Sequence, residues 1–340
     1  MRRRSARSAA LALLACACVG PAPPERTLAT ASDGRPAMGT VLEITLVGPD
    51  ARALRAAMDP LFAEATRLDR LMTPWDAASD AARLNAAAGR GPLPVAPEVA
   101  DLLARSAALS SLTRGAFDVT LGPLVSLWNE AGARGEVPSR EAVAAARSRV
   151  GASQLRVGSD GRVELAAGAA VNLGGVAKGY ALDRMLPLLR AAGARAALLS
   201  FGQSSAWALG APPGAAGWRL LARAPGGGFL GILTLRDRAL SVSGSQGSFA
   251  LIGGRRYGHV IDPRSGEPLV EERLALVVAP DATLAEALSK AVLVLGPREG
   301  LELVAAQSGC EALLADAQGG VAQTRGWGAA VAWQALASES

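Results

Sequence analysis

Residues 171–183 read VNLGGVAKGYALD and combine an apolar strand end, two adjacent glycines, a lysine and the start of a helix that we expect to run to Leu189. Glycines let a ligand approach the backbone, a helix N-terminus favours negative charge, and Lys178 can neutralise that charge. The segment fits neither the Walker phosphate loop nor the GxGxxG dinucleotide fingerprint. It therefore predicts a phosphate site of another kind, and the alternative is a plain strand-to-helix turn with a surface lysine.

Residues 256–266 read RYGHVIDPRSG and hold the only histidine in the chain, His259, three residues before Asp262. Histidine is the one side chain whose unperturbed pKa lies near neutrality, so a histidine beside a carboxylate is a candidate proton carrier. The alternative is a hydrogen-bonding residue at the end of a strand, since paired groups do not always mark a functional site.

The composition is that of a globular protein. The chain has 340 residues, of which 50% are hydrophobic, and this is enough for one large domain or two interlocked ones. The formal net charge is +5, but residues 1–7 contain four arginines, so the rest of the chain is nearly balanced. No nucleic-acid-binding patch is implied.

The N-terminus resembles a bacterial secretory signal, with a basic start and an apolar run at 9–15 that is too short to span a bilayer. Residues 13–16 read LLAC, similar to a lipobox in which Cys16 is lipidated, and the alternative is an ordinary cleaved signal. We therefore predict a signal peptide at 1–15, a lipid-anchor tether at 16–35 and a single folded domain at 36–340. The predicted location is the periplasmic side of the cell envelope, attached to a membrane through Cys16.

Helices and strands alternate irregularly along the folded part, which predicts an α+β fold rather than a regular doubly wound sheet. Apolar patterns predict strands at 41–47, 194–200, 218–223, 231–235 and 274–278, and a hairpin at 154–165. Helical patterns cover 51–71, 97–113, 138–150, 281–292 and 298–308, and Pro60 is expected to divide the first helix or to open its second half. Residues 116–128 are expected to form an apolar loop, and Cys310 to be a small buried hydrophobe outside any disulfide or metal site.

Two loop features are open to two interpretations. Trp75, which follows Pro74 between two helices, is either a stacking surface for a planar ligand or a half-buried packing residue. Asp118 and Thr120 lie in apolar surroundings, where an unpaired buried polar group costs about 1–3 kcal/mol. They therefore either cap local backbone or contact a ligand.

Six segments in a fixed order together resemble the FAD:protein FMN transferase family, also called the thiamine-biosynthesis lipoprotein or ApbE family. The resemblance extends from Met38 to about Val304. The six segments are Met38-Gly39-Thr40, the helix from Ser79 to Asn85, Phe117-Asp118-x-Thr120 with a downstream Leu127-Trp128, residues 174–183, a Ser-Gly turn and residues 259–266. Each segment alone is a weak signal, whereas the ordered set is specific.

The resemblance implies a bacterial envelope enzyme that binds FAD, splits its pyrophosphate and moves FMN onto a threonine or serine hydroxyl of an acceptor flavoprotein, releasing AMP. It implies an α+β fold with the nucleotide in a cleft between two interlocked lobes. For this reaction, we expect Lys178 to balance the charge of the phosphates. Our hypothesis is that His259, oriented by Asp262, takes the hydroxyl proton or helps to hold the pyrophosphate. The implied FAD contacts are Met38, Trp75, Ala116, Phe117, Asp118, Asn172, Lys178 and the segment His259-Val260.

The resemblance also implies Mg²⁺, held by the backbone carbonyl of Gly175 and by an Asp and a Thr one helical turn apart. This chain has Glu286 and Lys290 at those two positions. Mg²⁺ demands near-ideal octahedral geometry, and an ammonium group cannot be a ligand. Glu286 and Lys290 either pair with each other across one helical turn, or Lys290 takes the place of the metal.

Three functions therefore remain: a transferase with an altered or absent metal requirement, an FAD-binding lipoprotein that has lost transfer, and an FAD pyrophosphatase that gives FMN and AMP. We expect the first, because the nucleotide and histidine segments are intact.

Overall fold

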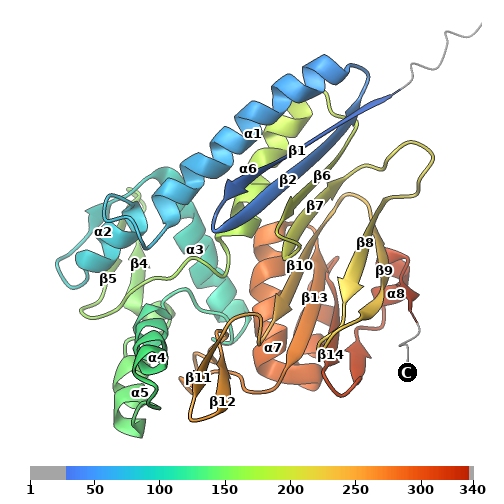
Figure 1. Ribbon diagram of the computed structural model, residues 1–340. Coiled ribbons are helices and arrows are strands. Elements are labelled where there is room, and N and C mark those ends of the chain that lie inside the picture. Colours follow the sequence, from blue (N-terminus) through green and yellow to red (C-terminus); the bar gives the residue numbers. More distant parts are fainter. Residues whose placement is uncertain (1–27, 337–340) are drawn as a thin grey trace, which may run out of the picture.

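The computed structural model describes residues 28–336, which form a large sheet with long helices along one side and a smaller lobe beside it (Figure 1). The central sheet is antiparallel throughout, in the order β1-β2-β6-β7-β10-β13-β14-β15. Its strands are β1 (Ala29–Ala37), β2 (Thr40–Gly48), β6 (Ala196–Phe201), β7 (Ser205–Leu209), β10 (Arg238–Gly244), β13 (Arg273–Ala279), β14 (Glu311–Asp316) and β15 (Val321–Gln323).

Both faces of the central sheet are covered. One face packs against three helices, α1 (Ala51–Met72), α6 (Ala177–Ala191) and α7 (Ala282–Ala305), and together they form the largest hydrophobic core. The other face packs against a three-stranded sheet and a short helix, which are β8 (Trp218–Arg223), β9 (Phe229–Leu235), β16 (Gln334–Ala335) and α8 (Trp327–Val331). The central strand β13 is buried from both sides, which is why its sequence is a nearly continuous apolar run.

The smaller lobe is built from two separate parts of the chain. The first part supplies α2 (Asp80–Ala86), β3 (Leu93–Pro94), α3 (Pro97–Leu112), α4 (Gly122–Arg134), α5 (Arg140–Arg147), the 3-10 helix η1 (Ala152–Gln154), β4 (Leu155–Val157) and β5 (Arg162–Leu165). The second part is a hairpin of β11 (Phe249–Ile252) and β12 (Arg255–Gly258), which packs against α4 through a third apolar cluster. Because central strands lie between the two parts in sequence, the lobes interlock, and the predicted α+β class is confirmed.

The predicted start of the folded domain at residue 36 is wrong, because β1 begins at Ala29 and pairs with β2 along its whole length. Residues 29–35 have the polar, small-residue composition of a tether, and only Ala31 among them is buried. Backbone hydrogen bonds to β2 hold this segment at the edge of the sheet, where few side chains need to be apolar. The predicted signal peptide and Cys16 lie outside the described residues.

Two helix predictions also differ from the structure. Pro60 does not divide the first helix, since α1 is continuous with the proline inside it. The expected loop at 116–128 contains the start of α4. Pro123 occupies its first helical turn, where a backbone N–H has no partner within the helix, so the missing N–H of proline costs no hydrogen bond. Leu124, Trp128 and Ala131 then face the lobe's core at helical spacing. Across residues 28–336, we find no helix with the length and apolar character that crossing a bilayer requires.

The first turns of α6 and α7 are in close contact. A Cβ added to Gly179 of α6 would lie 2.4 Å from the backbone oxygen of Ala282, so only glycine allows this approach. Asp183 then caps α7: one carboxylate oxygen accepts from the Ala282 N–H at 2.8 Å, and the other accepts from the Thr283 N–H and hydroxyl at 2.9 Å and 2.5 Å. This contact fixes the first turn of α6 against the helix that carries Lys290.

Replacing Gly179 with alanine should lower the free energy of unfolding by about 1–3 kcal/mol, because the new methyl group meets backbone that cannot move aside. Chemical denaturation followed by circular dichroism measures this. The control is Gly328→Ala on α8, where no atom lies within 4 Å of the added Cβ. The control should be neutral or slightly stabilising, and equal losses in both variants would contradict the packing argument.

Candidate active site

A cleft of about 530 Å³ opens between the two lobes. Its walls come from the chain before α4, the turn before α6, the ends of β7 and β10, the histidine segment and α7. Most of the residues predicted at the site line this cleft: Ala116, Phe117, Asp118, Asn172, Gly175, Lys178, His259, Val260 and Lys290.

The glycine segment is held in place by a side chain of α2. Residues 171–176 form no strand, contrary to the prediction, and Asn85 takes the place of a neighbouring strand. Its amide donates to the Val171 carbonyl at 3.0 Å and accepts from the Val171 N–H at 2.7 Å. Sequence reasoning missed this role of Asn85, because the partner is backbone far away in the chain.

The segment then turns into α6 at the cleft. The side-chain oxygen of Asn172 accepts from the Gly174 N–H at 3.0 Å and shapes the turn. Val176 precedes the helix and makes no side-chain cap. The uncapped, partly positive end of α6 therefore lies where Gly175 and Lys178 line the cleft, which favours a bound anion.

The chain contains only two lysines, Lys178 and Lys290, and both line the cleft. The ammonium of Lys178 donates to the Ser204 hydroxyl at 2.7 Å. Within residues 28–336, neither lysine lies within 4.0 Å of a carboxylate. The cleft thus holds two positive charges without direct counter-charges, an arrangement that suits a pyrophosphate.

The environment of Lys290 weakens its hold on the proton. Burial lowers the pKa of its ammonium; nearby Glu286 acts in the opposite direction, and the charge of Lys178 lowers the pKa further. A phosphate bound between the lysines would stabilise the charged form of both. An anion in the cleft would therefore offset the repulsion between the two ammonium groups and the burial of Lys290.

His259 lies at the exposed edge of the cleft and is oriented by backbone. Its Nδ1 atom lies 3.0 Å from the Ser248 carbonyl oxygen and 3.3 Å from the Ser248 backbone nitrogen, so the backbone of Ser248 orients the ring in either tautomer. Crowding by the cleft walls lowers the pKa of His259, although the Ser248 contact opposes this, and Lys290 and Lys178 lower it further. A neutral imidazole near pH 7 can accept a proton.

The prediction that Asp262 orients His259 is wrong. Both carboxylate oxygens of Asp262 accept from the guanidinium of Arg264, at 3.0 Å and 2.8 Å, and one also accepts from the Arg264 N–H. A tight turn causes this, since the Gly266 N–H donates to the Asp262 carbonyl at 2.8 Å and directs the carboxylate toward Arg264. Sequence reasoning missed Ser248, because a backbone carbonyl can belong to any residue type.

The predicted metal ligands do not form a Mg²⁺ site. Glu286 is fully buried; one of its carboxylate oxygens accepts from the Ser205 hydroxyl, and the other has no hydrogen-bond partner. Lys290 projects past Gly175, with its Cε atom 3.9 Å from where a Cβ on that glycine would stand. No group of three or more acidic, histidine or cysteine side chains in the described part could hold a metal ion. One carboxylate beside an ammonium does not fit Mg²⁺.

Asp118 and Thr120 serve the local structure. The Asp118 carboxylate accepts from the Ser110 hydroxyl at 2.6 Å and from the Thr120 N–H at 2.8 Å. The Thr120 hydroxyl in turn accepts from the Gly151 N–H at 2.7 Å. These local contacts fix the path of Ala116 and Phe117 along the cleft. Asp118 also lines the cleft, and its contact with a ligand stays a prediction.

Met38 and Trp75 do not line the cleft. Met38 lies in the β1–β2 turn with φ of 49°, and its N–H donates to Asp69 at 2.9 Å. Trp75 is 87% exposed, so the half-buried packing interpretation is wrong. Its loop is closed by the Ser79 hydroxyl, which donates to the Thr73 carbonyl at 2.5 Å, and this leaves the indole in solvent.

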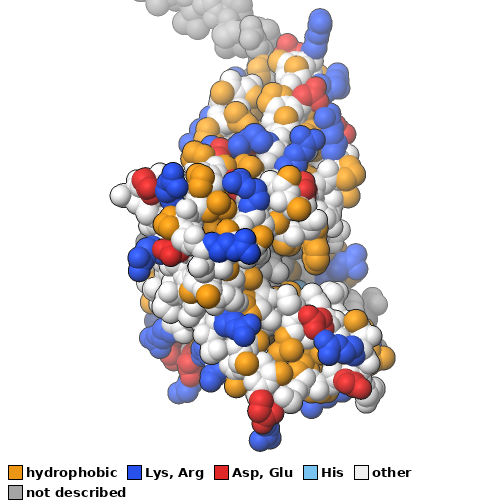
Figure 2. Space-filling view, turned by 90° about the vertical axis from the view of Figure 1, so that its left-hand side faces the viewer, with side chains coloured by type: hydrophobic (Ala, Val, Ile, Leu, Met, Phe, Trp, Pro, Cys, Tyr) orange, Lys and Arg blue, Asp and Glu red, His pale blue; other side chains and the backbone are white. Residues whose placement is uncertain are grey.

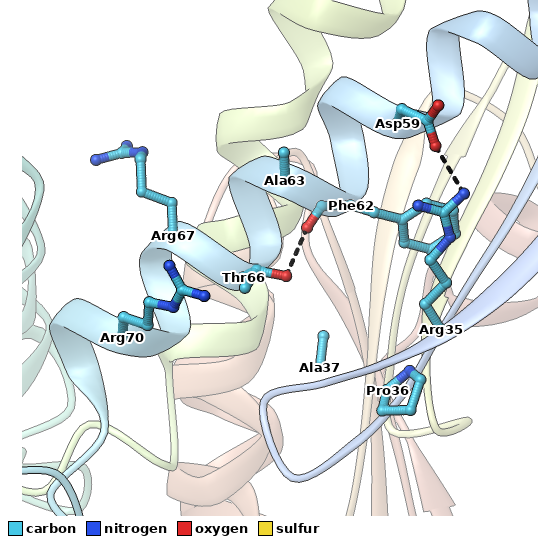
Figure 3. A pocket seen from close by; sticks show the side chains of 9 residues that line it. All are labelled: Arg35, Pro36, Ala37, Asp59, Phe62, Ala63, Thr66, Arg67 and Arg70. Atoms are coloured by element: carbon cyan, nitrogen blue, oxygen red, sulfur yellow. Dashed lines mark hydrogen bonds and ion pairs between the residues drawn. The ribbon is translucent and has the colours of Figure 1, made fainter.

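A depression on the outer surface, between β1 and α1, contains three arginines but shares no residue with the cleft (Figure 3). Arg35 pairs with Asp59 at 2.7 Å and lies 4.2 Å from the centre of the Phe62 ring. Arg67 pairs with Glu64 and Glu98. These carboxylates neutralise two of the three arginines, in contrast to the lysines of the cleft.

Because the chain has a single histidine, the effect of the two lysines on its pKa can be measured directly. In protein without a histidine tag, NMR titration should give His259 a pKa below the usual 6.5, because burial and two ammonium groups disfavour the imidazolium. Lys290→Ala and Lys178→Ala should each raise it, and a pKa unchanged in both variants would contradict the charge argument. Any activity that needs the neutral ring should fall as pH drops through this pKa.

The sequence profile of the ApbE family matches residues 38–314. Among curated proteins, the FAD:protein FMN transferase of Klebsiella pneumoniae (strain 342) is 32% identical over 297 residues, covering 84% of this chain and 84% of the relative. The FAD:protein FMN transferase of Escherichia coli (strain K12) is 28% identical over 294 residues, covering 84% and 83%.

Solved structures agree with the sequence comparisons. The apo crystal structure of the Pseudomonas stutzeri flavinyl transferase ApbE is 31% identical, with a TM-score of 0.77, and the match covers 89% of this chain and 96% of that one. The ApbE protein from Thermotoga maritima is 26% identical, with a TM-score of 0.79. The family match accounts for both the order of the six segments and the arrangement of the cleft. This chain belongs to the ApbE family.

Proposed function

We propose that this protein is an FAD:protein FMN transferase, which moves FMN from FAD onto a threonine or serine hydroxyl of an acceptor protein and releases AMP. The observation that carries the proposal is the content of the cleft: the only two lysines and the only histidine of the chain line it together. Family membership and the names of the curated relatives support the same reaction.

The cleft offers the groups that this phosphoryl-type transfer needs, which are mainly positioning and neutralisation of charge. The pyrophosphate of FAD would lie against Lys178, Lys290 and the uncapped start of α6. The acceptor hydroxyl loses its proton to the neutral imidazole of His259, and its oxygen forms a bond to the phosphorus of the FMN half. The bond from that phosphorus to the bridging oxygen breaks, and AMP leaves with this oxygen.

We propose that transfer needs no Mg²⁺ in this protein. The ammonium of Lys290 lies beside Gly175, and two lysines together supply the positive charge that a divalent ion would otherwise bring to the pyrophosphate. Glu286 is buried behind Ser205 and is not free to reach into the cleft. The membrane anchor at Cys16 and the location in the cell envelope rest on the N-terminal sequence alone and stay predictions.

His259→Asn should reduce flavin transfer by about 10²–10⁴-fold, the usual contribution of a general base, because asparagine cannot take the hydroxyl proton. Purified protein is incubated with FAD and a flavin-acceptor domain, and covalent flavin fluorescence on the acceptor is measured. FAD binding and the melting temperature of the variant serve as controls for folding. Free FMN from the wild-type protein would instead indicate hydrolysis, and bound, unchanged FAD a binding protein.

Asp262→Asn is the matched comparison for the histidine variant. It should cost much less transfer than His259→Asn, because Asp262 contacts Arg264 and not the imidazole. If both variants are folded and lose transfer activity equally, Asp262 and not Ser248 would be the residue that orients His259.

Metal removal tests the role of Lys290. Wild-type transfer should be unchanged by EDTA or by added Mg²⁺. Lys290→Ala should lose transfer both with and without added Mg²⁺, because the ammonium group is removed and the carboxylate of Glu286, buried behind Ser205, cannot hold the ion in its place. Loss of wild-type activity in EDTA, restored by Mg²⁺, would overturn the metal-free proposal.

A further inference from the structure

A second cavity, of about 460 Å³, lies between α4 and the β11–β12 hairpin, and we call it the hairpin groove. The two elements that form it lie side by side at the bottom of Figure 1. Four residues line both the hairpin groove and the cleft: Val125, Ser248, His259 and Ile261. The two cavities therefore meet at the histidine, which is accessible from either one.

The wall of the hairpin groove is preformed by aromatic packing. Trp128 of α4 stacks on Tyr257 of β12 with 5.2 Å between ring centres, and its indole N–H donates to the Gly266 carbonyl at 2.9 Å. Gly132 lets α4 approach the hairpin closely, since a Cβ there would lie 2.9 Å from the Cβ of Ala250. A segment that binds here would not have to open the lobe, which lowers the cost of binding.

The hairpin presents apolar side chains to solvent beside the groove. Phe249 is 45% exposed and Leu251 is 61% exposed, and both belong to residues that line it. Figure 2 shows hydrophobic side chains at the surface in the lower part of the molecule, bordered by charged ones. Exposed apolar groups next to a reactive side chain favour contact with apolar parts of a partner.

The rim of the groove is positively charged. Arg255 and Arg256 lie on β12, 5.5 Å and 4.7 Å from the ring centres of Tyr257 and Phe249. Neither forms an ion pair with a carboxylate of the described region, whereas Arg134 and Arg264 nearby are paired with Glu130 and Asp262. Side chains alternate along a strand, so Arg255 shares the hairpin face of Tyr257, whereas Arg256 shares the face of Phe249 and Leu251. The free guanidinium group of Arg256 beside these apolar side chains complements an acidic partner.

We propose that the hairpin groove binds the acceptor segment that carries the target hydroxyl. The segment is extended, places apolar side chains against Phe249 and Leu251, and has an acidic residue facing Arg256, which projects from the same face of the hairpin. This rests on the proposed function: if FAD fills the cleft, the hydroxyl must reach His259 from another side, and the groove is the cavity that shares this histidine. An extended segment fits a groove between a helix and a hairpin, where a compact surface would not enter.

The test separates binding of the acceptor from binding of FAD. Two variants, Leu251→Asp and Arg256→Glu, are assayed with an acceptor domain that the wild-type protein modifies. We expect the KM for the acceptor to rise by about tenfold or more, with kcat and the KM for FAD unchanged, as for loss of uniform binding. The control is Leu221→Asp on β8, which is 51% exposed and lies outside the groove, and it should behave as wild type.

An acceptor whose acidic residues near the target are changed to lysine should restore a low KM with the charge-reversed Arg256→Glu variant, and this would establish the direct contact. An unchanged KM for the acceptor in both variants would overturn the inference. A raised KM for FAD alone would also overturn it, because the groove would then belong to the nucleotide. Failure of the wild-type protein to modify any acceptor would instead reject the proposed function, and the inference with it.

Discussion

The contact between the first turns of α6 and α7 is the constraint on which the cleft depends. Gly179 brings the two helices close together, and Asp183 ties α6 to the first N–H groups of α7. Lys178 lies one residue before that glycine, and Lys290 lies two turns into the capped helix. A single packing contact thus directs two positive charges into one cavity, although their residues are more than a hundred positions apart.

The cost of this arrangement is electrostatic, and it explains what the cleft can bind. Two ammonium groups without carboxylate partners repel each other, and burial adds to the cost for Lys290. A pyrophosphate removes that cost when it binds. Burial by the cleft walls lowers the pKa of His259, and the same two charges lower it further, so the groups that hold the substrate also favour the neutral imidazole that can activate the hydroxyl.

Much of the fold could be predicted from the sequence because its elements carry local signals. The strand at 41–47, the helix from Pro97 and the hairpin at 154–165 lie where apolar spacing and turn residues predict them. The errors have physical causes. β1 is held by backbone pairing at a sheet edge, α4 begins at the Gly122-Pro123 pair, which resembles a turn signal, and Asp262 is drawn to Arg264 by a turn. None of these effects depends on local apolar periodicity.

The sequence by itself determined the family, the α+β class and the identity of the reactive groups, because side-chain chemistry and motif order are written along the chain. The scarcity of lysine was a further signal for Lys290, since only two occur among 340 residues. Only the tertiary structure decided that Ser248 orients His259, that Glu286 is buried away from the cleft and that a second cavity meets the first at the histidine. Those facts depend on backbone groups and on distances between remote segments, which residue types alone do not specify.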